Sequence, residues 1–105
     1  MRPIRLPALA LLLLPGLALA QGGDPSFQVT NNTGTTINQL HVSSAAQGGW
    51  GQDRLGSGTL SNGSSFQVRL PAGQCINDVR VVFPDGRRQD RRHVNTCQEK
   101  EVVFR

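Results

Sequence analysis

The densest charge in the sequence lies in residues 87–93, which could bind an anion. The segment reads Arg87-Arg88-Gln89-Asp90-Arg91-Arg92-His93, so that Asp90 is its one acid. A guanidinium group directs paired N–H donors at a carboxylate, phosphate or sulfate. Charged residues on an edge strand also prevent sheets from aggregating edge to edge. We favour this protective role, and keep as candidate anion ligands Arg87, Arg88, Arg91 and Arg92.

The single tryptophan, Trp50, lies between two glycines and could anchor a partner's side chain or a sugar ring. The neighbouring Asp53 and Arg54 would complete such a site. In the alternative that we favour, flexible glycines fold the ring back to plug the open end of a small β domain. Asp53 would then cap local backbone groups, and Leu55 would pack beside the ring.

Acid–base or metal chemistry would depend on His41 and His93, the two histidines of the chain. A zinc site needs three or four ligands, and the two cysteines are expected to bond to each other. No nucleophile motif surrounds a serine, and no glycine-rich loop joins a strand to a helix. We therefore predict surface histidines, no metal, no cofactor and no enzyme activity.

The first 20 residues have the pattern of a secretory signal peptide. Arg2 and Arg5 precede an apolar stretch, and Ala18-Leu19-Ala20 provides a small-x-small cleavage site. Pro7 and the Pro15-Gly16 pair interrupt the stretch before it reaches the roughly 20 apolar residues of a membrane span. We expect cleavage before Gln21 and a periplasmic or secreted protein with no stable membrane anchor.

Removal of the leader changes the charge and the size of the chain. The net charge of +4 falls to +2, because nine basic residues then face seven acids. This mild charge, and arginines with no aromatic residue among them, argue against nucleic-acid binding. The remaining 85 residues make one small domain that needs added stabilisation. In an oxidising compartment Cys75 and Cys97, the only cysteines, are expected to form a disulfide.

The elements that must position these residues are short strands. Residues 21–26 are polar and predict a flexible lead-in, and the domain itself should span 27–105. Apolar and polar residues alternate in several segments separated by Gly, Pro and Asn, the pattern of a small β-sandwich. We predict an all-β, antiparallel, immunoglobulin-like sandwich of six to seven strands. They should lie near 27–29, 36–43, 59–60, 66–70, 76–83, 87–94 and 101–104, with a long irregular stretch over 44–57.

The strongest strand, 76–83, is followed by Pro84-Asp85-Gly86, residues that favour a tight turn. A hairpin centred on this turn brings Cys75 near Cys97. Because Cys97 lies farther from the turn than Cys75 does, the hairpin should contain a bulge of about two residues, with the disulfide at its open end.

The chain resembles a group of small exported bacterial proteins of unknown function. Trp50-Gly51-x-Asp53-x-Leu55-Gly56 is the most specific shared motif. The others are Phe27-x-Val29-x-Asn31-x-Thr33-Gly34, Ile37-x-x-Leu40-x-Val42-Ser43, Cys75-x-x-Asp78-Val79-Arg80, Asp85-Gly86 and Val94-Asn95-x-Cys97. The resemblance implies a periplasmic or secreted β domain and no particular activity. It favours a bacterial source, in which the N-glycosylation patterns beginning at Asn31 and Asn62 matter less.

These features predict an exported, non-enzymatic binding or interaction module. Its partner would be a protein, a small anion or a saccharide, and its site the Trp50 loop followed by the arginine strand. The alternative is a small inhibitor of an exported hydrolase that presents a disulfide-braced loop to the active site.

Overall fold

The computed structural model describes residues 23–105 of the 105-residue chain. The predicted signal peptide over 1–20 and the first two residues of the expected lead-in lie outside this range. No helix in the described part of the chain is long and apolar enough to cross a membrane.

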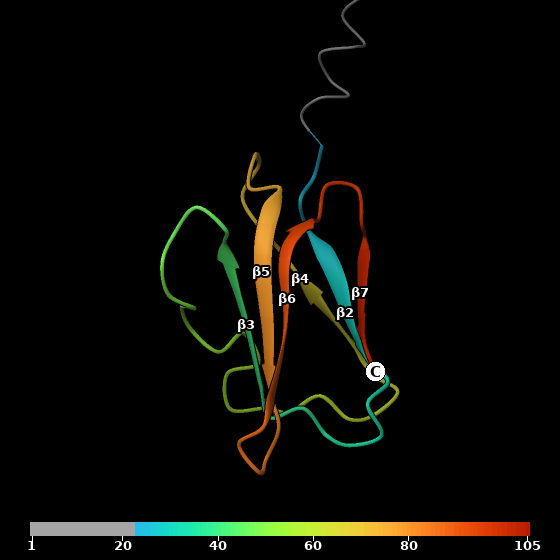
Figure 1. Cartoon of the computed structure of the whole chain (residues 1–105). Helices are drawn as coiled ribbons and strands as arrows, with labels where there is room; N and C mark the ends of the chain where they lie inside the picture. The colour runs from blue at the N-terminus through green and yellow to red at the C-terminus, as the bar shows by residue number, and fades with distance from the viewer. Residues whose placement is uncertain (1–22) are drawn as a thin grey trace, which may run out of the picture.

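Two three-stranded sheets build the domain (Figure 1). The first has the order β4-β2-β7 and the second the order β3-β5-β6. Their bounds are β2 Phe27–Asn31, β3 Gln39–Ser44, β4 Ser65–Val68, β5 Ile76–Val82, β6 Arg88–Asn95 and β7 Glu101–Phe104. The predicted fold class, a small all-β sandwich with one disulfide, is confirmed.

Two details of the sheets differ from the sequence-based expectation. The expected strand at 59–60 is an isolated bridge between Leu60 and Ile37. The first and last strands, β2 and β7, pair in parallel, while every other pair of neighbouring strands is antiparallel. A parallel pair joins strands far apart in sequence, so local turn signals carry no information about it.

The core lies between the two sheets and follows the alternation of the strands. In β2 the side chains of Phe27 and Val29 are buried, and in β5 those of Val79 and Val81. Successive side chains of a strand point to opposite faces, so the residues between them face outwards. The core consists of Phe27, Val29, Ile37, Leu40, Val42, Leu60, Val68, Leu70, Val79, Val81, Phe83, Val94, Val102 and Phe104.

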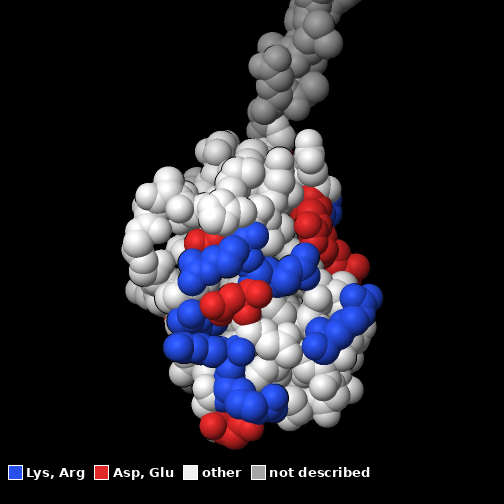
Figure 2. Space-filling view, viewed as in Figure 1, with Lys and Arg blue, Asp and Glu red and all other residues white. Residues whose placement is uncertain are grey.

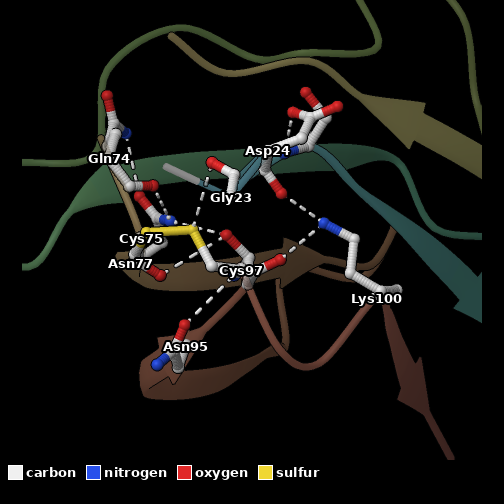
Figure 3. The surroundings of a disulfide bond; sticks show 10 residues. Gly23, Asp24, Gln74, Cys75, Asn77, Asn95, Cys97 and Lys100 are labelled. Atoms are coloured by element: carbon white, nitrogen blue, oxygen red, sulfur yellow. Dashed lines mark hydrogen bonds between the residues drawn. A yellow bond between two sulfur atoms is a disulfide. The ribbon is translucent and has the colours of Figure 1, made fainter. Parts of the chain in front are cut away.

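The disulfide joins Cys75 to Cys97 at the open end of the β5–β6 hairpin, as predicted, with 5.1 Å between the Cα atoms (Figure 3). The ladder also contains a bulge. Val79 lies opposite Arg91 but Asn77 lies opposite Val94, so β6 has one extra residue here. The expected bulge of about two residues is thus one residue within the ladder.

The end of the lead-in is held against the disulfide. Pro25 is fully buried, and Sγ of Cys97 lies 3.8 Å from the carbonyl oxygen of Gly23. The ammonium group of Lys100 donates to the carbonyl oxygens of Asp24 and Thr96 (Figure 3). Residues 23–26, the described part of the expected flexible lead-in, are therefore held against the domain.

A buried asparagine, Asn31, closes one end of the sandwich. Its amide nitrogen donates to the carbonyl oxygens of Thr35 and Leu60, at 2.8 and 2.9 Å. Its amide oxygen accepts from the N–H and the hydroxyl of Thr33. The side chain is fully buried, so this Asn-x-Thr pattern serves the fold, and its amide nitrogen is already used.

We expect Asn31→Asp to destabilise the domain by about 3 kcal/mol or more. The change places a carboxylate in the core and replaces the donor that bonds the carbonyl oxygens of Thr35 and Leu60 with a second acceptor, which repels them. Urea unfolding followed by circular dichroism measures the loss. Asn62→Asp is the matched control, because the exposed Asn62 uses only its amide oxygen, which accepts from the N–H of Gly34. Equal losses for the two variants would contradict this role of Asn31.

Replacing both cysteines by serine, which leaves no free thiol, should lower the free energy of unfolding by about 3 kcal/mol. The disulfide closes a loop with a sequence separation of 22, and its removal restores chain entropy to the unfolded state. The same urea titration measures the effect. A loss below about 1 kcal/mol would show that the hydrogen bonds around the disulfide hold this end without it.

Candidate binding surface

The side of the β3-β5-β6 sheet that faces away from the core, here called the outer face, gathers most of the candidate side chains. It is mainly polar, and the register of the three strands brings its side chains together. From β3, β5 and β6 in turn they are Gln39, His41, Ser43, Ile76, Asp78, Arg80, Val82, Arg88, Asp90, Arg92 and Asn95. In Figure 2, basic side chains spread over this side of the molecule, with acidic groups between them.

Trp50 lies on the outer face, against the arginines. The guanidinium carbon of Arg80 is 4.2 Å from the centroid of the ring, and that of Arg92 is 4.7 Å away. These are cation–π contacts. The ring is half-buried and takes no part in the core. The expected plug at the end of the sandwich is therefore wrong: other apolar side chains fill the core, and the cationic face offers the indole a partner.

Hydrogen bonds to β3 hold the loop that carries Trp50. The carboxylate of Asp53 accepts from the N–H groups of Leu40 and Leu55 at 3.0 and 2.9 Å, so Asp53 is the local backbone cap that was predicted. The N–H of Arg54 donates to the carbonyl oxygen of Leu40. A ring nitrogen of His41 lies 3.2 Å from the carbonyl oxygen of Gly51, so the loop is also attached beside Trp50.

Arg54 does not join Trp50 on the outer face. Its guanidinium group donates to the carbonyl oxygen of Arg69, which follows β4 in the other sheet. Arg54 therefore connects the loop to the neighbouring sheet. Oδ1 of Asp53 accepts both of its backbone hydrogen bonds, so the structure assigns Asp53 and Arg54 to holding the loop.

The structure divides the four arginines of β6 and its turn among three places. Arg88 and Arg92 lie on the outer face, whereas Arg87 pairs with Asp85 in the turn. Arg91 faces the other sheet, where it donates to the carbonyl oxygen of Val103 and pairs with Glu99.

β6 is an edge strand, as predicted. Two of its side chains also cover the neighbouring edge strand: Arg91 and Gln89 donate to the carbonyl oxygens of Val103 and Arg105, in and just after β7. Such contacts hide backbone groups that could pair with another sheet. Edge protection therefore explains Arg91 and Gln89, but not Arg88 and Arg92.

A buried carboxylate, Asp78, supports the bulge beneath this surface. It accepts from the N–H of His93 at 2.9 Å and from Arg92 at 3.3 Å. His93 has a φ of 54°, a left-handed conformation that is uncommon for residues other than glycine. This role of Asp78 is not predicted from the sequence: Asp78 is the one acid of β5, but the strand also contains Asn77 and Arg80, so its burial has no local signal.

Asp90 fixes the arginine beneath the tryptophan. Arg80 binds it with two parallel hydrogen bonds of 2.7 and 2.9 Å, the strong fork geometry. This bonding lowers the pKa of Asp90 and raises that of Arg80, and burial partly opposes both shifts. The positive charges of Arg92 and Arg88 lower the pKa of Asp90 further.

The two histidines belong to different strands, His41 to β3 and His93 to β6, with β5 between them. Residues 23–105 enclose no pocket. Within the same range, no three His, Cys, Asp or Glu residues are grouped as metal ligands. Among residues 23–105, the outer face is therefore the candidate binding surface.

Comparisons of the chain with protein-family models, with curated proteins and with solved structures found no match. The resemblance to small exported bacterial proteins stays a prediction. Functional inference therefore depends on the geometry of the site itself.

Asp90→Asn should make the stability of the domain depend less on pH in acid. A carboxyl whose pKa is lowered by folding stabilises the protein above its unfolded pKa of about 3.9. That contribution disappears as the pH falls through the lower folded value. The wild type should thus lose stability between about pH 5 and pH 2. The variant should be less stable than the wild type at pH 7 but should lose less stability over this range.

Urea unfolding at pH 7, 4 and 3 makes this measurement, and Asp85→Asn is its control. The pKa of Asp85 is also lowered, by Arg87, but this pair lies exposed in a turn and is screened by solvent. If the pH dependence of Asp90→Asn matches that of the wild type, the Arg80–Asp90 pair contributes little to folding.

Proposed function

We propose that this protein is an exported, non-enzymatic binding module whose ligand docks on the outer face, around Trp50. One observation carries this proposal: a half-exposed tryptophan lies outside the filled core, against two guanidinium groups. Tryptophan and arginine are the residues most enriched at the energetic centres of binding interfaces.

The fixed positions of these side chains support the proposal. Asp53 and the contact between His41 and Gly51 hold the loop, and Asp90 holds Arg80. Little side-chain freedom then remains to be lost on binding, which is a main cost of association. Preorganisation of this kind favours recognition of a ligand.

Export is part of the proposal. A leader-like N-terminus and a disulfide are both typical of proteins that work in an oxidising compartment. We do not propose the inhibitor alternative, because hydrogen bonds to β3, and not the disulfide, brace the loop that carries Trp50.

Trp50→Ala should weaken binding by about 2 kcal/mol, or roughly 30-fold, while the domain stays folded. The mature domain, immobilised, is used to capture partners from a periplasmic extract, and calorimetry then gives the affinity of each purified partner. Gln67→Ala, on the exposed side of β4 in the other sheet, is the control. If Trp50→Ala binds a captured partner as the wild type does, the outer face is not the binding surface.

A further inference from the structure

Going further, and resting on the proposed function, we infer that the ligand of the outer face is an acidic polysaccharide whose sugars carry carboxylate groups. The inference rests on the polarity of the face, on its single aromatic ring, and on the charges that its own ion pairs leave exposed.

The face is too polar for the centre of a typical protein–protein interface. Apart from Trp50, its apolar side chains are Val82 and, at the end of β5 next to the disulfide, Ile76. The strands otherwise contribute amide, imidazole, hydroxyl and charged groups. Interface centres are depleted in charged residues and rich in apolar area. Groups such as those of Gln39 and Ser43 instead suit the many hydroxyls of a saccharide, each of which donates and accepts hydrogen bonds.

Trp50 offers a flat apolar surface next to these polar groups. The C–H-bearing face of a pyranose ring packs on an indole in the same way as other flat apolar surfaces. Because the ring is only half-buried, part of it is open to such a contact. Sugar recognition needs this combination of one aromatic platform and surrounding hydrogen-bonding groups.

The charges of the face select an anionic sugar over a neutral one. Both acids of the face are already engaged: Asp78, whose side chain is 8% exposed, binds His93 and Arg92, and Asp90 binds Arg80 and, at 3.9 Å, Arg92. The side chain of Arg92 remains 54% exposed. Arg88 is exposed too, and no ion pair involves it among residues 23–105. The accessible charge is therefore positive.

A carboxylate on the sugar would be placed to use this charge. Arg92 lies both against the ring of Trp50 and at the exposed surface, so a sugar packed on the ring would bring its carboxylate to a guanidinium group. Arg88 lies four residues along the same strand, about 13 Å away, within reach of a following sugar. The absence of a pocket in the described chain fits a linear polymer that crosses an open face.

The test is affinity electrophoresis of the mature domain in gels containing polygalacturonate, a uronate polymer, or dextran, a neutral one. Polygalacturonate should retard the wild type and dextran should not. Trp50→Ala and the double variant Arg88→Ala/Arg92→Ala should each bind polygalacturonate at least tenfold more weakly. The control, Arg69→Ala/Arg105→Ala, removes the same net charge from exposed positions off the outer face and should bind within twofold of the wild type. Circular dichroism confirms that each variant is folded.

Three results would overturn the inference: no retardation by polygalacturonate, equal retardation by dextran, or equal weakening in the two double variants. The extract capture then separates this failure from that of the proposed function. If the wild type captures a protein that Trp50→Ala does not, and polygalacturonate does not compete, the face binds a protein and the ligand class is wrong. If neither polymer nor protein binds, both proposals fail.

Discussion

The register of the β5–β6 hairpin is the constraint on which both the core and the outer face depend. β5 is the central strand of its sheet and presents Val79 and Val81 to the core and Arg80 to the outer face. A slip of one residue would exchange these faces, burying the arginine and exposing the valines. The cost of that exchange explains why several features fix this hairpin.

Those features act at different points along the two strands. The Pro84-Asp85-Gly86 turn sets the start of the ladder, and Arg80 opposite Asp90 favours the same alignment. At the far end the cysteines would not meet without an extra residue in β6. The bulge supplies that residue, and Asp78 satisfies the N–H group that the bulge displaces. The disulfide and the bulge are thus parts of one arrangement, which also places Arg92 beside Trp50.

Local patterns in the sequence were enough to predict the strands, the disulfide, its hairpin and the cap formed by Asp53. Each depends on alternation or on turn chemistry within a short segment. Contacts between distant segments could not be predicted. The parallel pairing of β2 with β7 is one example, and the burial of Asn31, which has the sequence context of a turn residue, is another.

For the candidate site, alternation identifies which arginines share a face but not which loop folds over them. The sequence therefore predicts Trp50 at the sandwich end and Arg54 in the site, whereas the structure places Trp50 on the outer face and directs Arg54 to the other sheet.

The position of Trp50 is hard to explain by stability alone. Burying a large aromatic side chain in the core typically contributes several kcal/mol, whereas an exposed cation–π contact contributes about 0.5–1 kcal/mol. A small domain, with little core to spare, nevertheless keeps its largest side chain on the surface and aligns two arginines against it. Natural sequences depart from the most stabilising choice mainly at functional sites.

The arginines of β6 differ in the same way. The bonds of Arg91 to β7 and Glu99 explain its presence, whereas Arg88 has no ion-pair partner among residues 23–105. The parts of the outer face that folding does not explain, Trp50 and the exposed arginines, are those that a ligand would use.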